Sequence, residues 1–191
     1  MNDQHRTVSS EREELILVDR EDREIGFISK ADAHDGAGVL HRAFSLFLFN
    51  HDGELLVQQR APAKRLWGGY WSNSCCSHPR RGESLELATT RRLRDELNFD
   101  TELEHVYSFC YEARFGDMGS ENELCHVYLG RASDEVRPND SEIAAIRYLA
   151  PAQLETEFEK HPERFTPWFV QEWRELASTY REQLERYCES G

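Results

Sequence analysis

Two adjacent cysteines lie close to a histidine in the segment WSNSCCSHPRRGES, residues 71–84. Neighbouring residues such as Cys75 and Cys76 are badly placed to form a disulfide with each other. The chain has five cysteines, and this odd number also fits a disulfide framework poorly. A thiol such as Cys76, one residue before Ser77-His78, is useful in chemistry when nearby cations or a metal control its proton; otherwise it packs as a small apolar side chain. The spacing alone leaves both interpretations open.

A second group of candidate residues combines carboxylates with histidines. Glu121 and Glu123 lie in the segment SENELC, and in a strand their side chains point to the same face because side-chain direction repeats every two residues. Two parallel carboxylates repel each other unless a cation lies between them. Three histidines are candidates to complete a site for Zn²⁺ or Mn²⁺, namely His34, His41 and His78. These ligands are scattered over three segments, and taken alone the two glutamates are more typical of a solvated face.

The strands that must position these residues are indicated by short apolar runs. Residues 14–29 predict a hairpin around a polar turn. Residues 40–49 and 54–60 predict central strands that form a second hairpin, with Asp-Gly in its connection. Further strands are predicted at 104–115, 123–132 and 142–150.

Three segments predict helices. Residues 84–97 have Ser84 as the N-cap and apolar side chains at helical spacing. Residues 151–160 form a short helix that opens with proline, and residues 167–187 predict one long terminal helix. The mixture predicts a single domain over residues 14–188, with a sheet covered by helices on both faces, after a flexible tail at residues 1–13.

Composition and charge exclude several classes of function. The chain has 191 residues, 39% of them hydrophobic, which suffices for one domain with a substantial core. Its formal net charge of −13 repels phosphate backbones, so we expect no nucleic-acid partner. No apolar run approaches the roughly 18 residues that a membrane-spanning helix needs, so we expect no membrane partner. The polar first fourteen residues lack the apolar stretch of a secretion signal, and a cytoplasmic location is expected.

Four segments taken together resemble a known family. The segments are HDGAGVLHRAFSLFLFN, LLVQQRAPAKRLWGGYWSNSCCSHPRRGES, ENELC and FTPWF. In this order and at these separations, they resemble type I isopentenyl-diphosphate isomerase, a member of the Nudix superfamily. The resemblance runs from about Leu15 to the terminal helix. It implies a single α/β (α+β) domain with a Nudix-like mixed β-sheet, and an enzyme that interconverts isopentenyl and dimethylallyl diphosphate by moving a double bond one carbon along.

The chain departs from the signature of Nudix hydrolases, whose glutamates hold Mg²⁺. Residues in suitable places are Glu83, Arg91, Leu93, Asp95 and Glu96. Ser77 stands where the signature begins with glycine, Asn98 where it has a later glycine, and Arg92 where hydrolases carry a glutamate. A guanidinium in place of an anionic ligand or base removes the group that would activate water, so hydrolysis is expected to be disabled. Arg92 can also form an i,i+4 pair with Glu96 on the helix surface.

The resemblance implies an acid–base pair and a metal site. Cys76 and Glu123 would flank the substrate, one delivering a proton and the other removing one, with the Tyr111 hydroxyl assisting Glu123. Cys75 would be a packing residue. The implied ligands of one divalent ion, Mn²⁺, Zn²⁺ or Mg²⁺, are His34, His41, His78, Glu121 and Glu123.

The resemblance also implies how the small-molecule substrate is bound. The residues implied for the diphosphate are Lys30, Arg60, Lys64 and Arg92. A Mg²⁺ would be bound to the diphosphate by Glu96 and the backbone carbonyl of Cys76. Trp168 would face the carbocation, where a cation–π contact contributes about 1–2 kcal/mol, although core packing is the commoner role of a tryptophan. Gly68 replaces the family's proline and loosens a turn. A monomer or weak homodimer is expected.

Two other functions remain open from the sequence. One is a Nudix hydrolase of a nucleoside diphosphate derivative, against which Arg92 argues. The other is a catalytically inactive Nudix-like binding module, against which the intact set of cysteine, histidine and glutamate residues argues.

Overall fold

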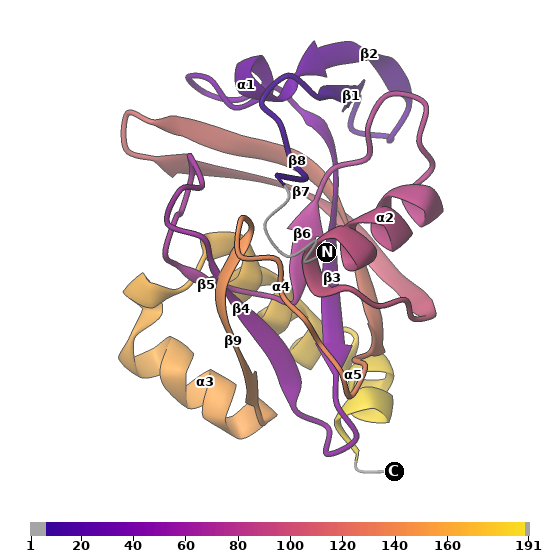
Figure 1. The fold of residues 1–191 in the computed structure, drawn as a ribbon, viewed down its shortest axis with the longest axis vertical. Coiled ribbons are helices and arrows are strands. Elements are labelled where there is room, and N and C mark those ends of the chain that lie inside the picture. The colour runs from indigo at the N-terminus through magenta and orange to yellow at the C-terminus, as the bar shows by residue number, and fades with distance from the viewer. Residues whose placement is uncertain (1–6, 190–191) are drawn as a thin grey trace.

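Strands β3 (His41–Phe49) and β8 (Gly119–Arg131) lie side by side and parallel in the middle of the fold (Figure 1). The structure is a computed structural model that describes residues 7–189. Within that range the strands form one mixed sheet: β1 (Glu14–Val18), β2 (Glu24–Ser29), β3 (His41–Phe49), β4 (Leu55–Arg60), β5 (Trp71–Ser72), β6 (Cys75–Ser77), β7 (Leu103–Phe115), β8 (Gly119–Arg131) and β9 (Ile143–Leu149). The helices are α1 (Lys30–Ala33), α2 (Leu85–Leu97), α3 (Pro151–Lys160), α4 (Pro167–Ser178) and α5 (Arg181–Cys188), with a 3₁₀ turn at Pro162–Arg164.

The first predicted hairpin is confirmed, and the second is only partly right. Strands β1 and β2 pair antiparallel along their length. Strands β3 and β4 pair at one position, Phe49 with Leu55, and then diverge. Ser74 explains the divergence, because its hydroxyl accepts from the amide of Leu48 (2.9 Å) and donates to the carbonyl of Leu56 (2.6 Å). The segment around Ser74 therefore separates the two strands.

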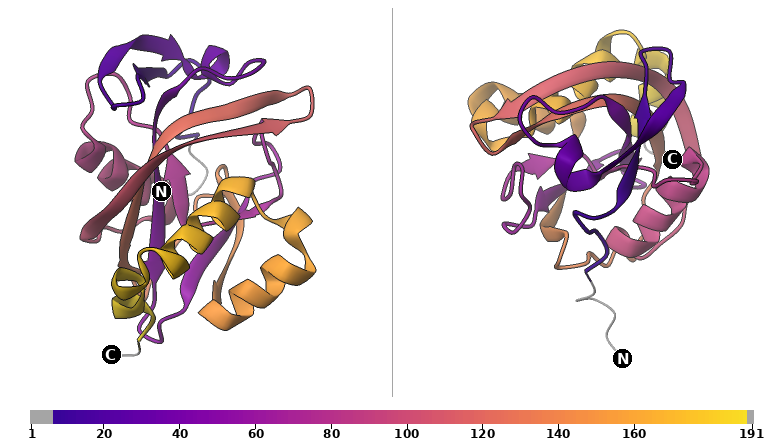
Figure 2. Two further views of the ribbon diagram at one scale, coloured as in Figure 1. Left: turned by 180° about the vertical axis from the view of Figure 1, so that it is seen from behind. Right: turned by 90° about the horizontal axis from the view of Figure 1, so that it is seen from above.

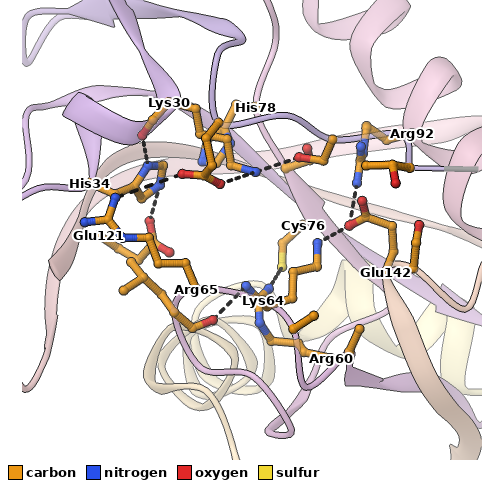
Figure 3. A pocket seen from close by; sticks show the side chains of 18 of the residues that line it. Lys30, His34, Arg60, Lys64, Arg65, Cys76, His78, Arg92, Glu121 and Glu142 are labelled. Atoms are coloured by element: carbon orange, nitrogen blue, oxygen red, sulfur yellow. Dashed lines mark hydrogen bonds and ion pairs between the residues drawn. The ribbon is translucent and has the colours of Figure 1, made fainter. Parts of the chain in front are cut away.

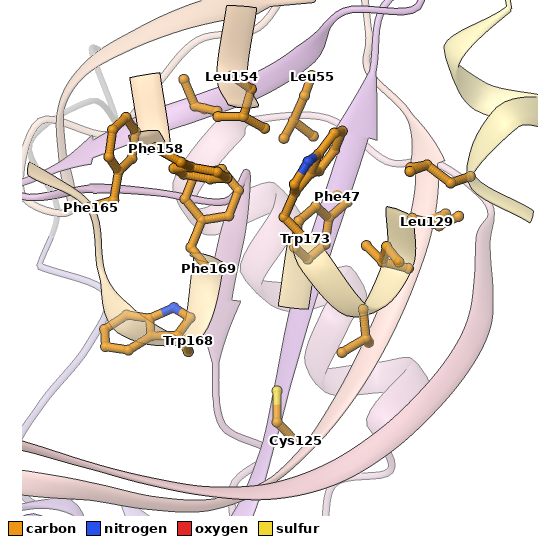
Figure 4. Packing of buried hydrophobic residues seen from close by; sticks show 14 of the residues in the cluster. Phe47, Leu55, Cys125, Leu129, Leu154, Phe158, Phe165, Trp168, Phe169 and Trp173 are labelled. Atoms are coloured by element: carbon orange, nitrogen blue, oxygen red, sulfur yellow. The ribbon is translucent and has the colours of Figure 1, made fainter. Parts of the chain in front are cut away.

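Different helices pack against the two faces of the sheet. Successive side chains of a strand point to opposite faces, so each strand contributes to both layers. Phe44, Leu46 and Leu48 of β3 pack with α2, whereas Phe47 and Phe49 pack with α3, α4 and α5. Figure 2 shows α4 and α5 across one face with α2 on the other, and Figure 4 shows the aromatic side chains of the α4 side. The predicted fold class, a mixed sheet with helices on both faces, is confirmed.

Local sequence signals explain how α2 begins and ends. The Ser84 hydroxyl accepts a hydrogen bond from the amide of Leu87 (3.2 Å), as predicted for an N-cap. Asn98 ends the helix in the left-handed conformation, with φ 62°. This conformation favours glycine and tolerates asparagine, which explains why Asn98 serves where the Nudix signature has glycine.

The prediction of one long terminal helix was wrong, because the chain breaks between α4 and α5. The hydroxyl of Ser178 donates to the carbonyl of Arg174 (2.7 Å), a local bond that competes with continued helix. The ring of Tyr180 stacks on Tyr107 of β7, with centroids 4.7 Å apart. This packing fixes the turn between the two helices.

A flexible tail was predicted for residues 1–13, and residues 1–6 of it lie outside the described residues. Residues 7–13 contact the domain. The Ser9 hydroxyl accepts from Lys30 Nζ (2.6 Å), the Val8 carbonyl accepts from Arg92, and Glu13 pairs with Arg80 (2.8 Å). Among residues 7–189 no helix is long and apolar enough to cross a membrane.

Candidate active site

A cavity of about 640 Å³ collects residues from α1, α2, α4, β4, β6, β7 and β8 and from the loops between them (Figure 3). The predicted site residues that line it are Lys30, His34, Arg60, Lys64, Cys76, His78, Arg92, Tyr111, Glu121, Glu123 and Trp168. Two others lie behind its wall: His41 is fully buried against the other histidines, and Glu96 is buried beside Arg92. The fold thus gathers segments that are far apart in the sequence.

The two adjacent cysteines point to opposite faces of the sheet because they are consecutive residues of β6. Cys75 packs in the core beneath α2, with Sγ 3.4 Å from Oε1 of Glu96. Cys76 packs toward α4 and lines the cavity. Cys76 is therefore the thiol that a bound molecule can reach.

The Cys76 thiol is partly buried at the cavity wall, with one cation beside it. Arg60 Nη1 lies 3.7 Å from Sγ, and the hydroxyl of Ser72 lies 3.9 Å from it. Burial raises the pKa of Cys76 to about 11, although the Arg60 guanidinium acts in the opposite direction. The thiol consequently holds its proton at neutral pH.

Glu123 of β8 is held by partners on two other strands and by His78, which directly follows β6. Tyr111 of β7 donates its hydroxyl proton to Oε2, and Nε2 of His78 lies 2.8 Å from Oε1. His41 of β3, directly opposite Glu123 in the parallel register, has Nε2 3.7 Å from Oε1. Burial raises the pKa of Glu123, but the interactions with His41 and Tyr111 outweigh it and leave the pKa below its usual value. The carboxylate is ionised at neutral pH.

Five side chains form a compact group with the composition of a metal site. One ligand atom from each lies within 4.8 Å of all the others in the set His34, His41, His78, Glu121 and Glu123. The expectation that Glu121 and Glu123 share a face is therefore confirmed. The three imidazole rings contact one another, with centroids 4.8–5.2 Å apart.

The hydrogen bonds behind two of these rings show that the group fits a divalent cation. His34 Nδ1 lies 2.6 Å from the carbonyl oxygen of Lys30, and His41 Nδ1 lies 2.7 Å from that of Val39. Because a carbonyl oxygen only accepts, each Nδ1 carries a proton, and each Nε2 faces the carboxylates. In a neutral ring that Nε2 presents a lone pair, as metal ligation requires.

One buried atom in the same group, Nε2 of His41, has no hydrogen-bond partner, and Oε2 of Glu121 has only the imidazole of His34, with Nε2 at 2.9 Å. Buried polar atoms are rarely left unsatisfied, so the His41 nitrogen calls for an explanation. Burial lowers the pKa of His34, but Glu121 more than compensates and raises it to about 9. Without an ion, His34 therefore keeps a proton toward Glu121; a divalent cation would take the place of that proton and give Nε2 of His41 a partner.

The other end of the cavity carries positive charge. Lys30, Lys64 and Arg92 line it together with Glu142, and Figure 3 shows Lys64 and Arg92 converging on the Glu142 carboxylate. Arg92 Nε also donates to Glu96 (2.8 Å), so the expected i,i+4 pair forms on α2, but it is buried and does not lie on the helix surface, since both side chains are 2% exposed. Metal binding by Glu96 and by the Cys76 carbonyl stays a prediction.

Trp168 of α4 forms an aromatic wall beside the thiol. Its ring is 3% exposed, and the guanidinium of Arg60 lies 5.4 Å from the ring centroid. Trp67 packs edge-on against it at 5.1 Å. Trp168 is therefore both a core residue and part of the cavity lining, and Arg60 lies near the thiol rather than only near the lysines.

The sequence missed several residues that line the cavity, among them Ser9, Glu11 and Glu142. None belongs to a motif, because a carboxylate or hydroxyl brought in by a distant loop leaves no local pattern.

Gly68 also has a role beyond the predicted loosening of a turn. A Cβ there would lie 2.6 Å from the carbonyl oxygen of Pro62 and 2.9 Å from that of Lys64, so glycine permits the close approach of the loop that carries Lys64.

Comparison with known proteins agrees with this geometry. A family model of the NUDIX domain matches residues 39–169. The isopentenyl-diphosphate Delta-isomerase of Burkholderia multivorans is 46% identical over 82% of this chain and 89% of its own length. That of Serratia proteamaculans is 42% identical over 93% of this chain and 99% of its own length. The chain belongs to the isopentenyl-diphosphate isomerase family of NUDIX proteins.

Solved structures place this isomerase-family chain on the same fold. The crystal structure of DR0079 from Deinococcus radiodurans superposes with a TM-score of 0.70 at 25% identity, covering 85% of this chain and 98% of that one. The MutT protein from Methanosarcina mazei, at 15% identity and a TM-score of 0.55 over 78% of this chain, shows the shared fold alone. The named relatives favour the isomerase over the two alternatives left open by the sequence, hydrolase and inactive binding module.

Proposed function

We propose that the cavity interconverts isopentenyl and dimethylallyl diphosphate by adding a proton to one carbon and removing a proton from another, with Cys76 and Glu123 as the two proton-carrying groups. The observation that carries this proposal is their placement. Cys76 on β6 pairs with Ser45 on one side of β3, and Glu123 on β8 pairs with His41 on the other side. Both side chains line one cavity, so a small molecule between them has one group on each side.

The protonation states of the pair suit the stoichiometry of the reaction. The thiol carries a proton and the carboxylate is ionised, so the pair holds one proton between two sites. Moving a double bond by one carbon needs one proton delivered and one removed, and the substrate and product have the same formula. The pair can therefore complete a turnover without any redox cofactor.

Protonating an unactivated alkene produces a tertiary carbocation, which the cavity must tolerate while it excludes water. The face of Trp168 offers cation–π stabilisation of about 1–2 kcal/mol. Leu66 and the aromatic ring of Tyr111 add apolar surface to the lining. Because Tyr111 donates to Glu123, its hydroxyl holds the carboxylate in place at the reacting end.

The buried group of histidines and glutamates holds one divalent ion in this proposal, Mn²⁺, Zn²⁺ or Mg²⁺. When bound, the ion supplies positive charge that fixes the Glu123 carboxylate and adjusts its acidity. The backbone carbonyls of Lys30 and Val39 orient His34 and His41 for this task.

The diphosphate binds at the cationic end as its Mg²⁺ complex. Lys30, Lys64 and Arg92 supply charge-assisted hydrogen bonds, and Glu96 lies beside Arg92 as a candidate carboxylate for the Mg²⁺. Arg60 extends from the thiol side and can reach toward the diphosphate. The strongly acidic chain thus concentrates positive charge where the anion binds.

Incubation of the purified chain with isopentenyl diphosphate and Mg²⁺, followed by ³¹P and ¹H NMR, tests this function. Dimethylallyl diphosphate should accumulate to an equilibrium mixture with the diphosphate intact. Release of orthophosphate from this substrate, or of a nucleoside monophosphate from a nucleoside diphosphate derivative, would instead identify a hydrolase.

A further inference from the structure

Glu142 forms ion pairs with Lys64 and Arg92, two of the cationic side chains that are proposed to bind the diphosphate. Its carboxylate contacts Lys64 Nζ, and the same oxygen, Oε2, lies 3.2 Å from Arg92 Nη2. The side chain of Glu142 is only 4% exposed. Burial raises its pKa, but Lys64 and Arg92 more than offset this and hold the pKa below its usual value. Glu142 is therefore an anion built into the diphosphate end of the cavity.

The backbone around Glu142 holds this anion in position. Its carbonyl accepts a hydrogen bond from the amide of Ala61 (2.9 Å), and Ala61 lies three residues before Lys64 in the same loop. The amide of Glu142 donates to the carbonyl of Asn139 (2.9 Å). The carboxylate and the loop that carries Lys64 are thus fixed together, so the ion pair belongs to the architecture of the site.

A second carboxylate contacts the same guanidinium from another direction. Glu96 accepts from Arg92 Nε at 2.8 Å, so Arg92 lies between Glu96 and Glu142. A metal-free diphosphate that approaches Arg92 and Lys64 meets two carboxylates and must compete with Glu142 for both cations. A diphosphate that carries Mg²⁺ is less anionic, and it brings a cation that can compensate the carboxylates it disturbs.

We propose that Glu142 is a specificity-determining residue that makes the site select the Mg²⁺ complex of a diphosphate over the metal-free diphosphate. This inference rests on the proposed binding of the diphosphate at Lys64 and Arg92. Glu142 acts by disfavouring the wrong form of the ligand, since specificity is a difference between two affinities. Mg²⁺ and diphosphate then each strengthen the binding of the other, and the Glu142 carboxylate accounts for part of this mutual effect on affinity.

The substitution Glu142→Gln tests the inference without leaving a buried cation uncompensated. Arg92 keeps its pair with Glu96, and the Lys64 side chain is 20% exposed, so it can be hydrated. Glutamine has the same shape and keeps the backbone bond to Ala61. A matched control is Glu157→Gln, because Glu157 pairs with Arg147 (2.6 Å) outside the cavity and the change in net charge is identical.

The experiment measures binding of inorganic diphosphate to the full chain by calorimetry, once with Mg²⁺ and once with excess chelator. In the wild type, Mg²⁺ should tighten binding strongly. In Glu142→Gln, binding with chelator should tighten about 10-fold, and the ratio of the two affinities should shrink correspondingly. The control variant should match the wild type in both conditions. Circular dichroism and thermal melting confirm that each variant is folded.

Two results overturn the inference in distinguishable ways. If the wild type binds diphosphate but Glu142→Gln leaves the metal-free affinity unchanged or weaker, Glu142 does not select the Mg²⁺ complex and the proposed function stands. If the folded wild type binds no diphosphate even with Mg²⁺, the placement of the diphosphate in this cavity is wrong and the inference falls with it.

Discussion

The hydroxyl of Tyr111 donates a hydrogen bond to Oε2 of Glu123 from the position directly opposite it on the paired strands β7 and β8. Cross-strand partners share a face, so the geometry is set by strand register and needs no flexible loop. The phenol keeps its proton, because burial and the adjacent Glu123 raise the pKa of Tyr111 well above its usual value. Tyr111 is therefore a fixed donor to Glu123, one of the two groups proposed to carry protons.

Replacing Tyr111 with phenylalanine should lower kcat by about 10-fold to 100-fold and leave KM nearly unchanged, because the hydroxyl bonds to Glu123 and to none of the residues proposed to bind the diphosphate. Steady-state isomerase assays give both constants. Tyr107→Phe, on the same strand, is the matched control: its hydroxyl donates to the carbonyl of Glu172 (3.3 Å), and its loss should leave kcat unchanged. Equal effects of the two substitutions would show that Tyr111 has no special role.

Substitutions of the two adjacent cysteines should have different effects on activity. Cys76→Ala removes one of the two groups proposed to carry protons and should lower kcat by about 100-fold to 10,000-fold. Cys75→Ala should retain most activity and lower the free energy of unfolding by about 1 kcal/mol, because Cys75 packs beneath α2. Isomerase assays and denaturant unfolding of both variants check this. Loss of activity in Cys75→Ala with the fold intact would contradict the assignment.

The adjacent cysteines also illustrate what the sequence can and cannot predict. The spacing of Cys76 and His78 left the role of the thiol open, and the family resemblance singled out Cys76. The structure supplies the physical reason, since consecutive strand residues point to opposite faces. The shared face of Glu121 and Glu123 and the cap at Ser84 followed from local rules, and the structure confirms them.

Features that depend on distant contacts escaped prediction. Glu142 reaches the cavity through backbone pairing with a distant segment, its own with Ala61 and that of Ile143 with Arg60. The divergence of β3 and β4 comes from Ser74, which bonds both strands from a separate segment. The break after α4 coincides with the stacking of Tyr180 on Tyr107. Each of these follows from tertiary packing, for which apolar periodicity gives no signal.

Binding of a divalent ion should stabilise the fold measurably. A ligand present at 100 times its dissociation constant contributes about 2.7 kcal/mol, so the melting temperature of chelator-treated protein should rise when Mn²⁺ or Zn²⁺ is added. His41→Ala should abolish most of this rise, since His41 Nε2 is buried and aimed at the carboxylates. His51→Ala is the control, because that side chain is 81% exposed. An undiminished rise in His41→Ala would argue against the metal site.

Glu172 should make the stability of the protein depend on pH. This fully buried carboxyl of α4 lies 3.4 Å from the Cys125 thiol, and burial raises its pKa from 4.5 to about 8. Because the folded state binds the proton more tightly, the contribution of Glu172 to stability is complete below about pH 4.5 and is lost as the pH rises through 8.

Glu172→Gln removes this titration. Relative to the wild type, the variant should gain on the order of a few kcal/mol of unfolding free energy between pH 5 and pH 9, as measured by denaturant unfolding. Both proteins share all other titrating groups, so the difference isolates Glu172. A difference that does not change with pH would mean that Glu172 is ionised in the folded protein.

The most direct test of the acid–base pair is turnover of isopentenyl diphosphate with Mg²⁺ in deuterated water, followed by NMR. If Cys76 and Glu123 exchange protons with the solvent and with the substrate, the new methyl group of dimethylallyl diphosphate carries solvent deuterium, and Cys76→Ala forms this product at a small fraction of the rate. Dimethylallyl diphosphate formed at the normal rate with no solvent deuterium would mean that hydrogen moves directly within the substrate, and the central claim would be wrong.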